Sequence, residues 1–182
     1  MKRAIIVPAV LSGAPLAELK AWLGIRLSEE DQSLTALLRA AMETCEGFTG
    51  NMPLEAACEE ILPAASGWLC LATRPVQAVT SLESVAIDGT RSAIDPGGYE
   101  LDLDEDGTAR VRIIDAPAVH RIAVGFTAGI APGWSSLPEA LKHGILRLAA
   151  HHYRQRDRDP AEISPPAAVV ALWHPWRRMR LA

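Results

Sequence analysis

Residues 141–160 read LKHGILRLAAHHYRQRDRDP, a stretch that combines helical periodicity with three histidines and a cluster of arginines. At about 100° per residue, Leu141, Ile145 and Leu148 fall on one face, which predicts an amphipathic helix packed against a core. The helix is expected over residues 138–157. The question it raises is whether the histidines form a metal or catalytic site, or whether the segment belongs to a surface that another protein binds.

The three histidines point in different directions around this helix. His152 falls in the apolar face, whereas His143 lies nearly opposite, beside arginines, and no two histidines have the i, i+4 spacing of a helical zinc pair. We therefore expect one buried histidine, two surface histidines and no metal site. A metal-dependent hydrolase that uses His143, His151 and an acidic loop is the alternative.

Two further helices are expected near the N-terminus. Residues 15–24 carry a proline suited to a first helical turn and leucines at helical spacing. Residues 28–47 form a longer amphipathic pattern, in which Ser28 and Asp31 have the spacing of a capping box. Glycines at 47 and 50 are expected to stop this helix.

The middle of the chain, residues 55–127, has the pattern of β-strands. Short runs rich in β-forming residues are separated by turn signals such as Asp88-Gly89 and Asp106-Gly107. This predicts an antiparallel sheet or small barrel. The fold class is therefore α+β: two N-terminal helices and a long C-terminal helix, packed with a small antiparallel β-domain and followed by an extended C-terminal tail.

The composition suits one domain with a core of small and branched side chains. Of 182 residues, 49% are apolar but only 5% are aromatic. The formal net charge of −4 is uneven, because residues 1–136 carry 10 Lys/Arg against 18 Asp/Glu, whereas residues 137–182 carry 8 against 4. The basic C-terminal quarter suits contact with nucleic acid, an anionic membrane or an acidic protein surface.

The cysteines and the N-terminus bear on the compartment. Cys45, Cys58 and Cys70 form no CxxC pair, which argues against disulfides and a zinc cluster and favours a reducing compartment. No apolar run approaches the roughly 20 residues that span a bilayer. The start, MKRAIIVPAVLSGAPLA, imitates a secretory signal, but Pro8 interrupts its short apolar run, so secretion is the lesser alternative.

The run DLDEDG, residues 102–107, resembles the opening of a calcium loop. The twelfth position is Ile113 where a bidentate Glu is expected, and the flanks read as strands, so we expect a solvated acidic turn that closes a hairpin. Weak cation binding by these acids stays open. Motifs for a catalytic nucleophile or a phosphate-binding loop are absent from the sequence, which predicts no catalytic residues, no enzyme activity and no cofactor.

The C-terminal segment WHPWRRMRLA, residues 173–182, combines indoles with guanidinium groups. These side-chain types are enriched where binding energy is concentrated at protein interfaces. One interpretation is a partner-binding arm over residues 161–182, separate from a single domain over residues 1–160. The other is a tail that folds back, buries its indoles and leaves its arginines in solvent. The candidate partner-binding residues are Trp173, Trp176, Arg177, Arg178 and Arg180.

The order of these segments resembles that of head-tail connector (adaptor) proteins of long-tailed bacteriophages and of the related bacterial gene transfer agents. The similarity covers nearly the whole chain, through APLAELKAWLGI, LTALLRAAMETCEGFTGN, RPVQAVTSLESVAIDG, YELD, VGFTAGIAPGWSSLPEALKHGILRLAAHHYRQRD and LWHPWRRMR. One departure is LEAACEEILPAASG, residues 54–67, which is more acidic and less strand-like than the first strand of the family.

The resemblance implies a structural virion protein made in the bacterial cytoplasm. Its subunits would form a homo-oligomeric ring, a dodecamer, between the portal protein and a downstream stopper or tail-terminator protein. By that likeness the C-terminal arm docks on the portal, and DNA passes through the ring without sequence-specific binding and without contact with a membrane. A DNA-binding module that uses Arg154, Arg156, Arg158 and the tail is a further alternative.

Overall fold

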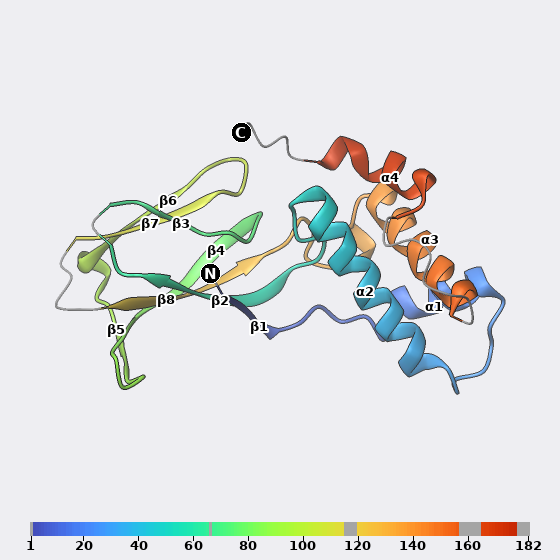
Figure 1. Cartoon of the computed structure of the whole chain (residues 1–182), viewed down its shortest axis with the longest axis horizontal. Coiled ribbons are helices and arrows are strands. Elements are labelled where there is room, and N and C mark those ends of the chain that lie inside the picture. The colour runs from blue at the N-terminus through green and yellow to red at the C-terminus, as the bar shows by residue number, and fades with distance from the viewer. Residues whose placement is uncertain (1, 66, 115–119, 157–164, 178–182) are drawn as a thin grey trace. The chain divides into compact units, whose positions relative to one another are not determined.

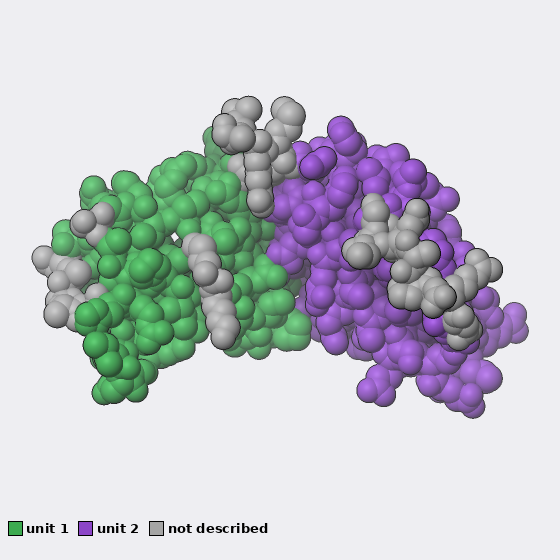
Figure 2. All heavy atoms as spheres, viewed as in Figure 1, with its two compact units in different colours: residues 1–8, 55–129 green, residues 9–54, 130–182 purple. Residues whose placement is uncertain are grey.

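The structure, a computed structural model, describes residues 2–65, 67–114, 120–156 and 165–177 (Figure 1). The chain separates into two compact units: unit 1 comprises residues 1–8 and 55–129, and unit 2 comprises residues 9–54 and 130–182 (Figure 2). The sequence predicted a boundary at residue 160, between a domain and a C-terminal arm, whereas the two units are divided after residues 8, 54 and 129. Each unit has its own set of buried side chains.

Unit 1 consists of antiparallel strands. Among its described residues, one sheet has the strand order β1-β2-β8-β4-β5 and another the order β3-β7-β6, and every paired strand is antiparallel. The prediction of an antiparallel β-region is therefore confirmed. The strands are β1 Lys2–Val7, β2 Ala56–Pro63, β3 Leu69–Cys70, β4 Val76–Val85, β5 Arg91–Ala93, β6 Tyr99–Leu103, β7 Ala109–Ile113 and β8 Arg121–Ala128, with a 3-10 turn η1 at Pro96–Gly98.

The first strand, β1, was not anticipated from the sequence. It pairs with β2, with Ile5 opposite Cys58, and therefore adds residues from the chain start to a sheet built otherwise from residues 56–128. The apolar run in β1 lacks the alternation of a half-buried strand, because neither of its faces is covered. A pattern argument consequently could not distinguish this strand from the apolar region of a signal peptide.

The acidic stretch in residues 54–67 is nevertheless a strand, because its carboxylates have partners. Glu60 is fully buried and accepts hydrogen bonds from the backbone N–H groups of Ala72 at 3.0 Å and Thr73 at 2.8 Å, and from the Thr73 hydroxyl at 2.6 Å. Glu59 binds the guanidinium of Arg91 on β5. The acids in β2 therefore tie the strand to its surroundings in unit 1.

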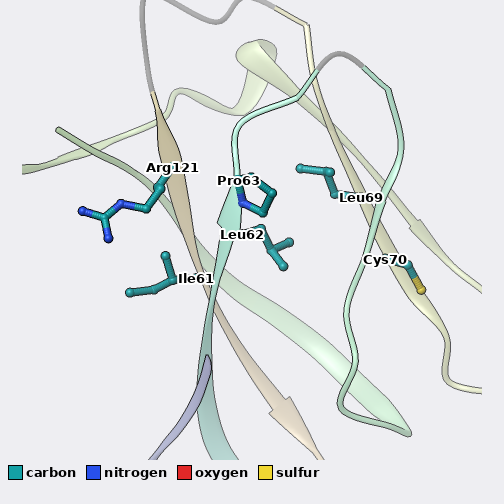
Figure 3. Close-up of a pocket in the computed structure, with 6 residues that line it drawn as sticks. All are labelled: Ile61, Leu62, Pro63, Leu69, Cys70 and Arg121. Carbon is teal, nitrogen blue, oxygen red and sulfur yellow. The ribbon is translucent and has the colours of Figure 1, made fainter. Parts of the chain in front are cut away.

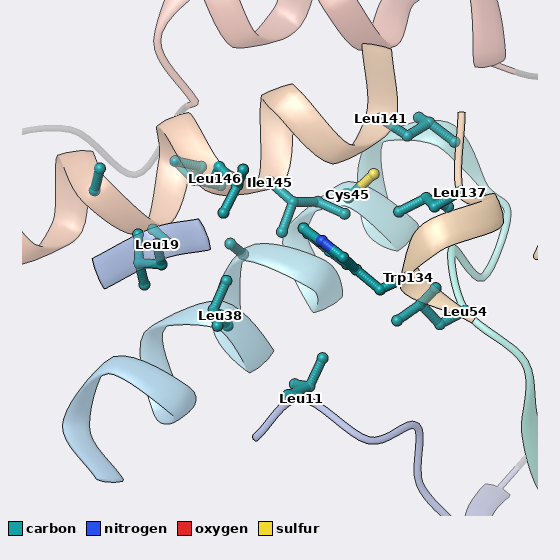
Figure 4. Close-up of a cluster of buried hydrophobic side chains, with 14 of the residues drawn as sticks. Leu11, Leu19, Leu38, Cys45, Leu54, Trp134, Leu137, Leu141, Ile145 and Leu146 are labelled. Carbon is teal, nitrogen blue, oxygen red and sulfur yellow. The ribbon is translucent and has the colours of Figure 1, made fainter. Parts of the chain in front are cut away.

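Unit 2 is helical. Its described elements are α1 Ala14–Leu23, α2 Asp31–Thr49, η2 Trp134–Ser136, α3 Glu139–Gln155, α4 Ala167–Trp173 and η3 His174–Trp176. Side chains of α1, α2, α3 and η2 converge on one apolar cluster that includes Leu19, Leu38, Trp134 and Ile145 (Figure 4). The two predicted N-terminal helices and the long C-terminal helix are confirmed. Pro175 lies two residues after the end of α4, inside η3, where it cannot donate the backbone hydrogen bond of a continuing α-helix.

Helix α2 begins three residues later and ends two residues later than predicted. Its N-terminal cap residue is Glu30, with no side-chain capping bond, so the predicted capping box is wrong. The carboxylate of Glu30 instead accepts hydrogen bonds from the Tyr153 hydroxyl at 2.6 Å and from Arg156 at 2.9 Å. The helix continues through Gly47 and stops at Gly50, whose φ of 75° is the left-handed conformation that glycine tolerates.

The glycine inside α3 is explained by α4. Trp173 is fully buried, and its indole Nε1 donates to the Leu141 carbonyl oxygen at 3.4 Å. A Cβ atom at Gly144 would lie 2.1 Å from this nitrogen. Gly144 therefore lowers the intrinsic helix stability by about 1 kcal/mol, and in return an indole can pack directly on the helix backbone.

We predict that Gly144→Ala destabilises unit 2 by about 1–3 kcal/mol, because overpacking against Trp173 exceeds the gain in helix propensity. Gly47→Ala in α2 is the matched control, since a Cβ there meets no atom within 4 Å. The control should be neutral or stabilising. Urea unfolding of both variants measures the difference, and equal stabilities would contradict the role of the indole.

Candidate functional site

The candidate site is the C-terminal end of unit 2, where α4 passes through η3 to the last described residues. Trp173 belongs to the core here and is not an exposed contact, so its assignment to a partner surface is corrected. The physical reason is the open backbone at Gly144, which accommodates the indole. Trp176 is half-buried against the same core, and Arg177 is exposed.

Helix α2 holds the chain in place at this end. The Asn51 side-chain amide donates to the Trp176 carbonyl oxygen at 3.1 Å. The Phe48 ring contacts the Trp173 indole with ring centroids 6.1 Å apart, and the Arg177 guanidinium lies 5.4 Å from the Phe48 ring centroid. The fold therefore fixes the positions of the half-buried Trp176 indole and of the neighbouring Arg177. Arg178 and Arg180 follow them in the sequence.

The structure thus brings Trp176 and Arg177 together at the surface, while Arg178 and Arg180 lie outside the described residues. Phe48 and Asn51 were not found by sequence reasoning. They lie more than 120 residues from their partners, and neither belongs to a motif. The arrangement can bind a surface that offers carboxylates and apolar area, because guanidinium groups form charge-assisted bonds with carboxylates.

Trp173→Ala should destabilise unit 2 by about 3–5 kcal/mol, the range for removing a buried tryptophan. Trp176→Ala should cost clearly less, because that side chain is only partly buried. Thermal unfolding followed by circular dichroism compares the two variants. The assignment of Trp173 to the core fails if the two substitutions have equal effects.

The three histidines of α3 do not converge. The His143 ring meets the Trp22 ring edge-on at 5.2 Å, whereas the ring centroids of His151 and His152 are 6.1 Å apart. His152 is half-buried, less than its place on the apolar face predicts, because it lies near the exposed last turn of α3. Within the described ranges, no group of three or more His, Cys, Asp or Glu side chains is placed to hold a metal ion.

Burial, and then the neighbouring His151, lowers the pKa of His152 below its ordinary value of 6.5. As the pH falls, the unfolded chain therefore binds a proton before the folded chain does. We expect unit 2 to lose stability as the pH falls below about 6.5, and His152→Gln to weaken this dependence. NMR titration of the imidazole measures its pKa directly, and a value above the ordinary one would contradict the structure.

The acidic run DLDEDG closes the hairpin between β6 and β7, as predicted. Arg110 binds both Asp102 and Asp104 at 2.7 Å, and the backbone N–H of Thr108 donates to the Asp106 carboxylate at 2.9 Å. Gly107 has a φ of 74°, as such a turn requires. These carboxylates therefore serve the hairpin and its cross-strand arginine.

A shallow pocket in unit 1 offers no catalytic arrangement. It is lined by Ile61, Leu62, Pro63, Leu69, Cys70 and Arg121. Figure 3 shows Arg121 and Cys70 on opposite sides of the apolar residues. The Cys70 thiol accepts a hydrogen bond from Arg74 at 3.3 Å, and the lining contains no histidine or carboxylate that could act as a base.

The structure also bears on membrane insertion. Among the residues it describes, no helix combines the length and apolar character needed to cross a bilayer.

Comparison with solved structures finds similarity along the entire chain. The chain resembles one from the neck of an empty gene transfer agent (GTA) particle, determined with C6 symmetry, with a TM-score of 0.81 and 27% identity. Chains from the virion of a native GTA particle and from the neck of a native particle, determined with C12 symmetry, give TM-scores of 0.78 and 0.77 at 28% identity. Each comparison covers 100% of this chain and 98% of the other.

No protein-family model matches the chain, and no curated protein sequence matches it. The chain therefore shares with these GTA chains both a fold and more than a quarter of its sequence. The resemblance to gene transfer agent particle proteins inferred from segment order is therefore confirmed over the full chain.

Proposed function

We propose that the chain is a structural subunit of the head-tail connector (adaptor) of a phage or gene transfer agent particle, without enzymatic activity. The observation that carries this proposal is the similarity to GTA neck chains over 100% of the chain. If the similarity were confined to one of the two units, the alignment would leave the other unit uncovered. The assembly would be located in the virion.

The proposed assembly is a homo-oligomeric ring, a dodecamer. Two of the similar chains come from neck assemblies determined with C6 and C12 symmetry, which supports a cyclic arrangement of copies. In such a ring many modest contacts between copies add up to a stable assembly. The ring would join the portal to a downstream stopper or tail-terminator protein.

DNA is proposed to pass through this ring without being bound in a sequence-specific way. Unit 1 carries 7 Lys/Arg against 12 Asp/Glu, and an acidic surface repels phosphates and favours sliding. The alternative of a DNA-binding module is not favoured by the geometry of α3. Arg156, the C-terminal cap residue of α3, binds Glu30 at 2.9 Å and stacks 4.4 Å from the Tyr153 ring centroid, so it is already engaged within unit 2.

Portal docking is assigned in this proposal to the end of the chain, through Trp176, Arg177, Arg178 and Arg180. The contacts of Asn51 and Phe48 support it, because they fix the point from which these residues leave the fold. Trp173 contributes indirectly, as the buried anchor of α4. Removal of residues 173–182 would therefore remove part of the core, so a clean test must preserve Trp173.

We predict that the triple variant Arg177→Glu, Arg178→Glu and Arg180→Glu remains folded but fails to attach to the portal. Reversing these charges would place carboxylates against a surface that binds guanidinium groups. Cosedimentation with purified portal, with electron microscopy of the stacked ring, measures attachment. The double variant Arg147→Glu and Arg154→Glu, at exposed positions of α3, is the control and should attach normally.

Normal attachment of the triple variant would exclude the C-terminal segment as the docking site. If the wild-type chain neither forms a ring nor binds the portal, the connector assignment itself loses its support. The two outcomes are separated by examining the wild-type protein first.

A further inference from the structure

The two sheets of unit 1 have four end strands among the described residues, β1, β5, β3 and β6. Of these, β1 and β6 are the two that expose large apolar side chains. β1 is the first strand of one sheet and β6 the last strand of the other, so each has a described strand partner on one side alone. The backbone N–H and C=O groups on the other side of such a strand can pair with another chain. The two strands have similar lengths, six and five residues.

Both edges carry exposed apolar side chains. Ile6 and Val7 on β1 are each 60% exposed, and Leu101 and Leu103 on β6 are 44% and 48% exposed. An exposed apolar edge strand invites aggregation unless a partner covers it. β6 pairs with β7 on one side, and no described strand pairs with it on the other.

The two edges have opposite net charges, although Arg110 and Arg112 pair with three of the hairpin acids, Asp102, Asp104 and Glu100. β1 begins with Lys2 and Arg3, whereas residues 99–113, the β6–β7 hairpin, contain five acids and two arginines. Antiparallel pairing of β1 with β6 would place the basic start of β1 beside the acidic turn that follows Leu103. Arg3 also contacts the Thr73 hydroxyl at 3.5 Å, so its position within unit 1 is set before any partner arrives.

We infer that β1 of one copy pairs with β6 of the next copy, which joins their sheets across the subunit boundary. The occupant of each edge is thus a second copy of this chain, as the opposite charges of the edges favour. Two different edges make a head-to-tail contact, the kind that closes into a ring when the rotation between copies allows it. Main-chain hydrogen bonds supply affinity, and the alternating side chains supply the register.

This inference rests on the proposed function in one respect: the partner is another subunit of the ring. Its test is self-association of the full-length protein, measured by sedimentation velocity alone and in the presence of portal. Ile6→Asp places a negative charge on β1, which the acidic β6–β7 hairpin of the next copy should repel. Leu103→Lys places a positive charge on β6, which the basic start of β1 should repel. Both positions are exposed, so the fold should survive, which circular dichroism checks.

Each single variant should stay monomeric under conditions in which the wild-type chain assembles. A mixture of the two should form heterodimers, because the intact β6 of the Ile6→Asp chain can still pair with the intact β1 of the Leu103→Lys chain. Ile87→Asp is the matched control, since Ile87 is 80% exposed in the loop after β4 and belongs to neither edge. It should assemble like the wild type.

Assembly of either single variant, or a mixture that stays monomeric, overturns the inference. If Ile6→Asp alone prevents assembly while Leu103→Lys assembles normally, two β1 edges pair with each other instead. A wild-type chain that stays monomeric both alone and with portal counts against the proposed function as well. If the wild-type chain and the single variants all form rings, the strand pairing is wrong but the proposed function stands.

Discussion

The contact between the Trp173 indole and the backbone at Gly144 fixes the end of the chain in unit 2. The indole occupies the space that a side chain at position 144 would fill, so this contact fixes where α4 packs on α3. The contact also involves α2, through the Phe48 ring. This packing also sets the positions of Trp176 and Arg177, because they follow the anchored Trp173 within four residues.

An anchored tail has a functional advantage over a free one. A free chain end loses conformational freedom when it binds, and that entropy loss weakens its affinity. Here Asn51 holds the backbone of Trp176, so the start of the arginine segment is ordered before it meets a partner. The basic segment begins at a fixed point of unit 2, as the proposed docking role requires.

Unit 1 is organised around charged groups that serve structure rather than chemistry. Buried Glu60 holds the backbone at Ala72 and Thr73, while the half-buried Glu59 and Glu83 share the guanidinium of Arg91. These hydrogen bonds raise the pKa of Arg91, chiefly through Glu59, so the group stays charged. The acidity of this unit is therefore compatible with stable strands.

The sequence by itself determined the α+β class, the helices and the hairpin at Gly107, because helical period, strand runs and turn residues are local signals. The segment order also led to the resemblance to gene transfer agent particle proteins, which the solved structures confirm. Local signals could not show that residues 2–7 form a strand, since that strand is recognisable by its pairing with β2 and not by its pattern. They also left the place of Trp173 open, and only the tertiary structure decided it: an indole can be buried there because a glycine distant in sequence leaves the backbone of α3 bare.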